Sequence, residues 1–138
     1  MYRCILVGLD GSNGSKSALR KAVILASESA VRLHAVGVEE HLPRFAATID
    51  EVDEAKEERD TFFNAVMAAG RQVATDEGVE LETKIAIGNA AKVIIQEAER
   101  VGADLIVLGH TRSVWGNLLG ATADRVVDHA HCDVLIVR

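Results

Sequence analysis

Residues 103–113 decide the fold of this chain, and they read ADLIVLGHTRS. A short apolar run, Leu105 to Leu108, ends abruptly at Gly109, and a small polar loop follows before a helical pattern begins. A strand, a glycine turn and a helix in that order bring backbone N–H groups and a positive helix end together. We therefore expect a site for a phosphate or another small anion. Because the apolar run does not alternate, the strand should lie in a parallel sheet covered on both faces.

The rest of the chain repeats this alternation of strands and helices. Apolar runs predict strands at 4–9, 33–38, 79–87, 103–108 and 133–137, and helical spacing predicts helices at 15–30, 49–76, 90–101 and 118–129. This order predicts an α/β protein with an open parallel sheet and helices on both faces. The third strand alternates in character, which favours an edge position.

Composition limits the classes of function. The 138 residues suit a single domain over 1–138, with ordinary hydrophobic (49%) and charged (26%) fractions. A net charge of −6 and only 4% aromatic residues argue against a nucleic-acid partner. No apolar run reaches membrane-spanning length, and no signal peptide is recognisable, so we expect a cytoplasmic protein without a membrane partner.

Two loops carry the residues most suited to chemistry. Ligands of open α/β sheets bind beyond the carboxyl ends of the strands, where the strand order reverses. Residues 8–15 follow the first strand and residues 109–113 follow the fourth, so both should line one crevice. Asp10 would be its only acid, placed to bind ribose hydroxyls or a cation that bridges phosphates. An aspartate that only stabilises the turn is an equal alternative. Neither loop matches the Walker or dinucleotide patterns.

Other polar clusters have simpler explanations. The acidic run at the start of the 49–76 helix suits a solvated helix face better than a metal or partner site. His129, His131 and Cys132 straddle a helix end and a strand start, so we expect no metal there. Cys4 should be a small core residue. Trp115 either covers a ligand or anchors its loop. No histidine–acid pair accompanies a nucleophile, so we expect no catalytic residues.

Along its whole length the chain resembles a universal stress protein domain. The resemblance rests on residues 5–12 (ILVGLDGS), 88–91 (GNAA), 102–109 (GADLIVLG) and 123–137 (ADRVVDHAHCDVLIV). It implies a Rossmann-like fold of the adenine-nucleotide α-hydrolase type, with five parallel strands in the order 3-2-1-4-5. It also implies a homodimer built through the last strand, whose residues 134–137 form an apolar edge that a soluble protein normally covers.

Family members that bind ATP are similar to the pattern Gly-x-x-Gly, nine residues, then Gly-Ser or Gly-Thr, with an aspartate after the first strand. Asp10, Gly109 and Gly120 match this pattern, but Arg112 replaces the second glycine and only seven residues separate it from Gly120. Ala121 replaces the Ser or Thr, although Thr122 adjoins it. A glycine would allow close backbone approach to phosphate, which an arginine resists, whereas an arginine side chain can itself bind phosphate.

The resemblance implies a small stress-response protein that binds ATP or another adenine nucleotide, with Mg, as a regulatory homodimer without significant turnover. Val38 would offer its backbone to adenine. Two alternatives remain: a dimeric interaction module that binds no nucleotide, and a nucleotide hydrolase. The predicted nucleotide-binding residues are Gly8, Leu9, Asp10, Val38, Leu108, Gly109, His110, Thr111, Arg112, Ser113, Gly120, Ala121 and Thr122.

Overall fold

Strands and helices alternate from one end of the chain to the other. The computed structural model describes residues 1–40, 49–110 and 120–138. The elements are β1 (Cys4–Gly8), α1 (Asn13–Ser27), β2 (Arg32–Glu39), α2 (Ile49–Asp76), β3 (Leu81–Ile87), α3 (Ala90–Val101), β4 (Leu105–Gly109), α4 (Ala121–His129) and β5 (Asp133–Val137). The prediction of an alternating α/β chain is confirmed.

The strands form one parallel sheet in the order β3-β2-β1-β4-β5, as expected. The chain builds outward from β1 to β3, then returns to the other side of β1 to add β4 and β5. The strand order therefore reverses between β1 and β4, where Val7 pairs with Val107. β3 occupies an edge, as its alternating sequence predicted.

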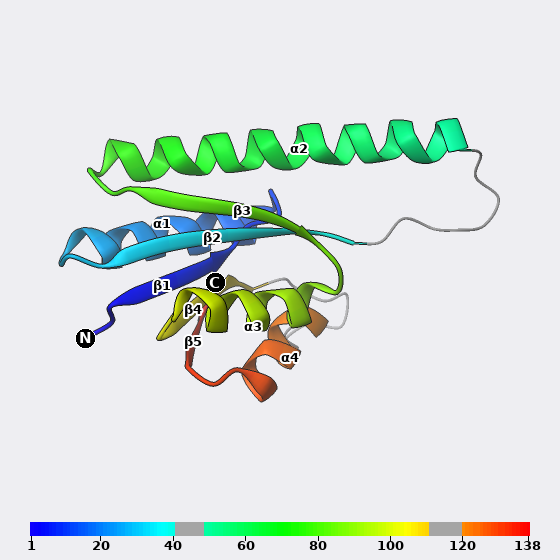
Figure 1. The fold of residues 1–138 in the computed structure, drawn as a ribbon. Helices are drawn as coiled ribbons and strands as arrows, with labels where there is room; N and C mark the ends of the chain where they lie inside the picture. The colour runs from blue at the N-terminus through cyan, green and yellow to red at the C-terminus, as the bar shows by residue number, and fades with distance from the viewer. Residues whose placement is uncertain (41–48, 111–119) are drawn as a thin grey trace.

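Helices cover both faces of the sheet. Helices α1 and α2 lie on one face, and α3 and α4 lie on the other (Figure 1). In β1 the side chains of Ile5 and Val7 join the first core, whereas Leu6 joins the second. Cys4 is fully buried, as expected of a core residue. Burial on both faces explains why the first and fourth strands are apolar at successive positions.

Local hydrogen bonds set boundaries that hydrophobic spacing alone missed. α1 begins two residues earlier than predicted, because Ser12 is its N-cap and accepts a hydrogen bond from the Ser15 backbone N–H at 3.2 Å. α3 starts as predicted after Asn89, whose side chain accepts from the Lys92 N–H at 3.1 Å. It ends before Gly102, whose φ of +72° suits a glycine.

β4 begins two residues later than predicted, because Asp104 has a different role. Its carboxylate accepts hydrogen bonds from the backbone N–H groups of Arg3 (2.9 Å) and Cys4 (3.1 Å), which ties the start of β4 to β1. Burial opposes ionisation of Asp104, but these hydrogen bonds outweigh it and lower the pKa of the carboxyl below its usual value.

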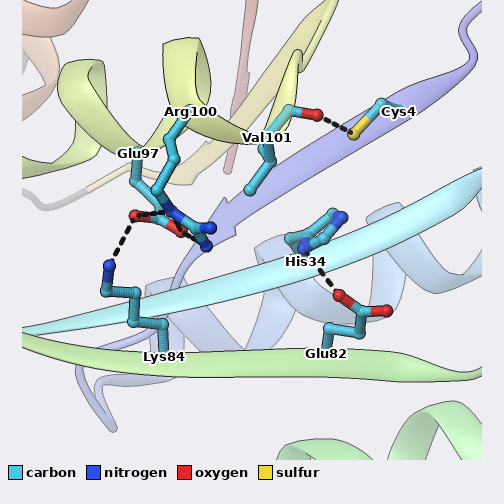
Figure 2. Close-up of polar contacts among 7 residues, drawn as sticks. All are labelled: Cys4, His34, Glu82, Lys84, Glu97, Arg100 and Val101. Atoms are coloured by element: carbon cyan, nitrogen blue, oxygen red, sulfur yellow. Dashed lines mark hydrogen bonds and ion pairs between the residues drawn. The ribbon is translucent and has the colours of Figure 1, made fainter.

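A polar network joins α3 to the edge strand. Figure 2 shows the buried Glu97 carboxylate between Arg100 of its own helix and Lys84 of β3. The Lys84 Nζ lies 3.4 Å from Glu97, and the Arg100 Nε lies 3.0 Å from it. These contacts, with the Coulomb attraction of both cations, lower the pKa of Glu97 despite its burial. On the same face of the sheet, His34 and Glu82 lie 3.4 Å apart. The Lys84–Glu97 ion pair therefore joins α3 to β3, and the His34–Glu82 pair joins β2 to β3.

The acidic run of α2 lies mostly on the helix surface. Asp53, Glu54, Glu57 and Glu58 are exposed, which agrees with a solvated helix face. No group of three or more His, Cys, Asp or Glu side chains in the described ranges is arranged to hold a metal ion. Of the helices that the structure describes, none is both long and apolar enough to cross a bilayer. The run has one exception, Asp60, which faces a buried carboxyl of β2.

Candidate functional site

A pocket of about 380 Å³ opens at the carboxyl ends of the strands, beside the point where the strand order reverses. Its walls come from the ends of β1, β2 and β4 and from the first turns of α1, α3 and α4. The predicted site residues that line it are Gly8, Leu9, Asp10, Val38, Leu108, Gly109, Gly120, Ala121 and Thr122. The loop after β1 and Gly109, the first residue of the loop after β4, therefore border one crevice.

The remaining predicted residues divide into two groups. His110 does not line the pocket. Its backbone N–H donates to the Val137 carbonyl at 2.7 Å, which extends the pairing of β4 with β5 by one residue. Its Nε2 is buried and has no hydrogen-bond partner among the residues that the structure describes. Thr111, Arg112 and Ser113 lie outside the described residues, as does Trp115.

Asp10 stabilises its own turn and also borders the pocket. Its Oδ1 accepts from the Ser12 N–H at 2.9 Å, and its own N–H donates to the Ser15 Oγ at 3.3 Å. Burial opposes ionisation, but interactions of the carboxylate with the side chain and backbone of Ser12 and the side chain of Ser15 outweigh it and lower the pKa of the carboxyl. The turn-stabilising interpretation is therefore correct as a description of the geometry. It leaves an ionised carboxylate at the pocket wall, so a second role toward a ligand is compatible with it.

Gly109 is explained by packing within the chain. A Cβ placed on this residue would lie 2.2 Å from the carbonyl carbon of Gly14 and 2.7 Å from the backbone nitrogen of Ser15. The end of β4 thus lies directly against the first turn of α1. This contact brings the two pocket loops together whether or not a phosphate is present.

The first turn of α4 supplies backbone donors to the pocket. Gly120 is the N-cap of this helix and provides no side-chain hydrogen bond. The residues that follow it, Ala121, Thr122 and Ala123, all line the pocket. N–H groups in the first turn of a helix lack intrahelical acceptors and carry the positive end of the helix dipole. The turn therefore favours an anion, and Thr122 adds a hydroxyl beside Ala121.

Val38 presents backbone groups to the same pocket. The Leu9 N–H donates to the Val36 carbonyl at 2.9 Å, and the Gly88 N–H donates to the Glu39 carbonyl at 2.9 Å. Backbone groups alternate in direction along a strand, so those of Val38 point, like those of Val36, toward the β1 side. β1 ends at Gly8, which pairs with Val36. Val38 thus directs a donor and an acceptor beyond the end of β1, into the crevice.

Sequence reasoning missed part of the wall, including a second acid. Glu40 lines the pocket, so the expectation that Asp10 would be its only acid is wrong. Alternation along β2 could have predicted Glu40, because it lies on the same side of the strand as Val36 and Val38. The missed residues are Ser12, Ser15, Val36, Glu40, Ala90, Ile94 and Ala123.

A second hollow, of about 320 Å³, lies at the opposite end of β2 and β3. Arg32, His34, Glu80 and Glu82 are among its lining residues. It faces the amino ends of the strands, where open parallel sheets seldom bind ligands. The His34–Glu82 pair at 3.4 Å also occupies part of its polar lining. The crevice at the carboxyl ends is therefore the stronger candidate site.

The fold is that of an α/β protein with an open parallel sheet, and the crevice lies at the switch point, where proteins of this class bind small ligands. The chain belongs to the universal stress protein family, whose family model matches residues 1–138. A universal stress protein of Methanocaldococcus jannaschii is 32% identical, over 100% of this chain and 83% of its own length.

Two solved structures are similar over nearly the whole chain. UspA from Lactobacillus plantarum is 30% identical with a TM-score of 0.86, covering 99% of this chain and 98% of its own. A universal stress protein in complex with cAMP is 25% identical with a TM-score of 0.78, covering 99% of this chain and 97% of its own. The prediction of the family from sequence motifs is confirmed.

Proposed function

We propose that this chain binds an adenine nucleotide in the crevice between β1 and β4. The observation that carries the proposal is the joint presence there of three kinds of group. Val38 directs a backbone donor and acceptor into the pocket, Asp10 adds an ionised carboxylate, and the first turn of α4 adds uncapped N–H groups. These groups match, in turn, the base, the ribose and the phosphate of a nucleotide.

The complexed relative supports this choice of ligand. The universal stress protein solved with cAMP matches 99% of this chain, including both walls of the crevice. A single phosphate also suits this pocket, because Asp10 and Glu40 are both acidic and repel additional negative charge. For a triphosphate, Mg²⁺ held in part by Asp10 would offset that repulsion.

We propose a regulatory binding protein of the cytoplasm, rather than an enzyme. The described pocket wall includes Ser12 and Ser15, but their hydroxyls interact with the α1 N-terminus and the Asp10 turn. Neither is paired with a histidine in the described part of the wall. Without a base held by an orienting partner, bound nucleotide should be released unchanged or hydrolysed slowly.

We also propose a homodimer formed through β5. Val134, Leu135 and Ile136 are only partly buried, whereas their partners on β4, which are Ile106, Val107 and Leu108, are buried. An apolar strand with one free edge favours pairing with a second copy. Nucleotide occupancy of such a dimer would be its regulatory signal.

A dimeric interaction module without nucleotide is the second candidate. It is favoured by the two carboxylates of the pocket and by the departures at Arg112 and Ala121 from the sequence pattern of ATP binders.

Calorimetric titration with AMP, cAMP and ATP, with and without Mg²⁺, tests the proposal. We expect at least one adenine nucleotide to bind with a stoichiometry of one per chain, and GMP to bind more weakly. Mass spectrometry of the denatured, freshly purified protein should detect co-purifying nucleotide. If no adenine nucleotide binds in either assay, the proposal fails and the interaction module is favoured. Phosphate release at about one per second or faster would instead indicate an enzyme.

A further inference from the structure

One turn of α2 contacts both strand-end segments that form the crevice. On the β1 side, a Cβ placed on Gly11 would lie 2.7 Å from the Phe62 Cζ and 3.1 Å from the Val66 Cγ2. The Phe62 ring therefore rests directly on the Gly11 backbone, whose φ of +84° belongs to the turn between Asp10 and Ser12. Phe62 remains 50% exposed, so its contact with Gly11 is not part of the ordinary burial of the core.

On the β2 side, the same turn holds the end of the strand. The Arg59 guanidinium donates to the backbone carbonyl of Glu40, a pocket residue. The next residue of α2, Asp60, lies near enough to the side chain of Glu39, which is only 4% exposed, to contribute to the raised pKa of that carboxyl. Glu39 and Glu40 directly follow Val38, so the two contacts hold the chain just after the backbone that points into the crevice.

The helix that carries these groups is itself firmly seated. A Cβ on Gly37 would lie 2.6 Å from the Met67 Cε and 2.7 Å from the Phe63 Cδ1, so α2 packs closely on the β2 backbone. Phe62 and Phe63 also pack edge to face, with ring centroids 5.4 Å apart. This packing thus fixes residues 59–63 of α2 relative to β2, independently of their contact with the Gly11 loop.

We propose that residues 59–63 of α2 are a positioning element of the nucleotide site, in which Arg59 and Phe62 set the distance between the Asp10 turn and the Val38–Glu40 strand end. This inference rests on the proposed function. Neither side chain lines the pocket. Arg59 acts through the backbone of Glu40, which does line it, and Phe62 acts through Gly11, which lies between the pocket residues Asp10 and Ser12. Such residues alter affinity by changing how well the site is preorganised.

The chain offers a matched control on the same helix. The Arg71 Nη1 donates to the Thr83 Oγ1 at 2.8 Å, which likewise joins α2 to a strand. Thr83 lies on β3 and does not line the pocket. Arg71→Ala therefore removes an equivalent helix–strand contact without touching the site.

The experiment compares Arg59→Ala, Phe62→Ala and Arg71→Ala for AMP and cAMP affinity and for thermal stability. We expect the first two variants to weaken binding by about 3- to 30-fold, the range typical of residues that alter coupling without touching a ligand. Arg71→Ala should lower the melting temperature to a similar extent but leave the affinity unchanged. Phe62→Leu, which keeps an apolar contact on Gly11, should restore part of the affinity.

A second readout does not depend on nucleotide. Exchange of the Ser12 amide, measured by NMR in the unliganded protein, should be faster in Phe62→Ala than in Arg71→Ala, because the Asp10–Ser12 turn loses its cover. If the wild type binds nucleotide but Arg59→Ala and Phe62→Ala bind as well as Arg71→Ala, the positioning role is wrong and the proposed function stands. If the wild type binds no nucleotide, the proposed function fails and Ser12 exchange alone decides whether residues 59–63 hold the turn. Equal exchange in the two variants would then overturn the inference.

Discussion

The backbones of Gly109 and Gly14 touch where β4 ends and α1 begins. A Cβ on Gly109 would lie 2.2 Å from the Gly14 carbonyl carbon and 2.3 Å from its oxygen. Two segments far apart in the sequence therefore meet through main-chain atoms, and both border the candidate site. A glycine that resembles part of a phosphate motif is required here by the fold itself.

Gly109→Ala should lower the free energy of unfolding by about 1–3 kcal/mol or more, because the new methyl group would overlap backbone atoms that cannot rotate away. Gly8→Ala is the matched control on the neighbouring strand. Its Cβ would meet the flexible end of Leu108 at 2.9 Å, which can shift at lower cost. Chemical denaturation measures both variants. A Gly109→Ala protein of wild-type stability that has lost nucleotide binding would instead favour close phosphate approach as the reason for the glycine.

Asp10→Asn separates the two roles of this residue. The asparagine Oδ1 still accepts the Ser12 N–H, so the turn should keep its geometry, and the thermal stability should fall only by the part that the ionised carboxylate contributes. Loss of the charge should weaken nucleotide binding by about 1.5–3 kcal/mol, or roughly 10- to 100-fold. Calorimetric titration measures the change. Glu28→Gln, at the opposite end of α1, controls for the loss of one negative charge. An unchanged affinity in Asp10→Asn would restrict Asp10 to stabilising the turn.

Glu39 should make stability depend on pH. Burial, followed by the hydrogen bond and repulsion from Asp60, raises the pKa of Glu39, although Arg59 and Lys56 oppose the shift. Because the pKa of Glu39 is higher in the folded than in the unfolded protein, protonated Glu39 stabilises the fold fully at pH values below its unfolded-state pKa. This stabilisation is lost as the pH rises through the folded-state pKa of Glu39. The free energy of unfolding should therefore fall over that range in the wild type.

Glu39→Gln should remove this fall, because an amide can donate to Asp60 at every pH. Urea denaturation at a series of pH values from acidic to mildly alkaline gives the slope. Glu40→Gln removes the same charge one residue further along and should retain the wild-type slope. Parallel curves for the wild type and Glu39→Gln would show that Glu39 keeps an ordinary pKa.

The dimer proposal predicts that Val134→Glu combined with Ile136→Glu gives a monomer. The dimer dissociation constant should rise at least about 100-fold, since burying an unpaired carboxylate costs several kcal/mol. Light scattering at micromolar concentration measures the assembly, and a melting curve confirms that the variant is folded. Ile87→Glu, on the exposed end of the other edge strand, should leave the dimer intact. A wild-type monomer under these conditions would contradict the proposal directly.

The sequence by itself determined the order of elements, the parallel sheet and the family. Continuous apolar runs in 4–8 and 105–108 record burial on two faces, and the helical ranges 49–76 and 90–101 follow from spacing, a property local to each segment. It also identified most of the described pocket wall, because loops at the carboxyl ends of neighbouring strands must meet.

Only the tertiary structure decided what each of these residues touches. The Asp104 contacts with Arg3 and Cys4 and the Gly109–Gly14 contact depend on distances between atoms far apart in sequence. Glu40 lines the site and Glu39 does not, because strand alternation turns them to opposite faces, and only the position of α2 reveals which side chains lie near each one. Hydrophobic pattern records whether a side chain is buried, but its partner is set by how whole elements pack.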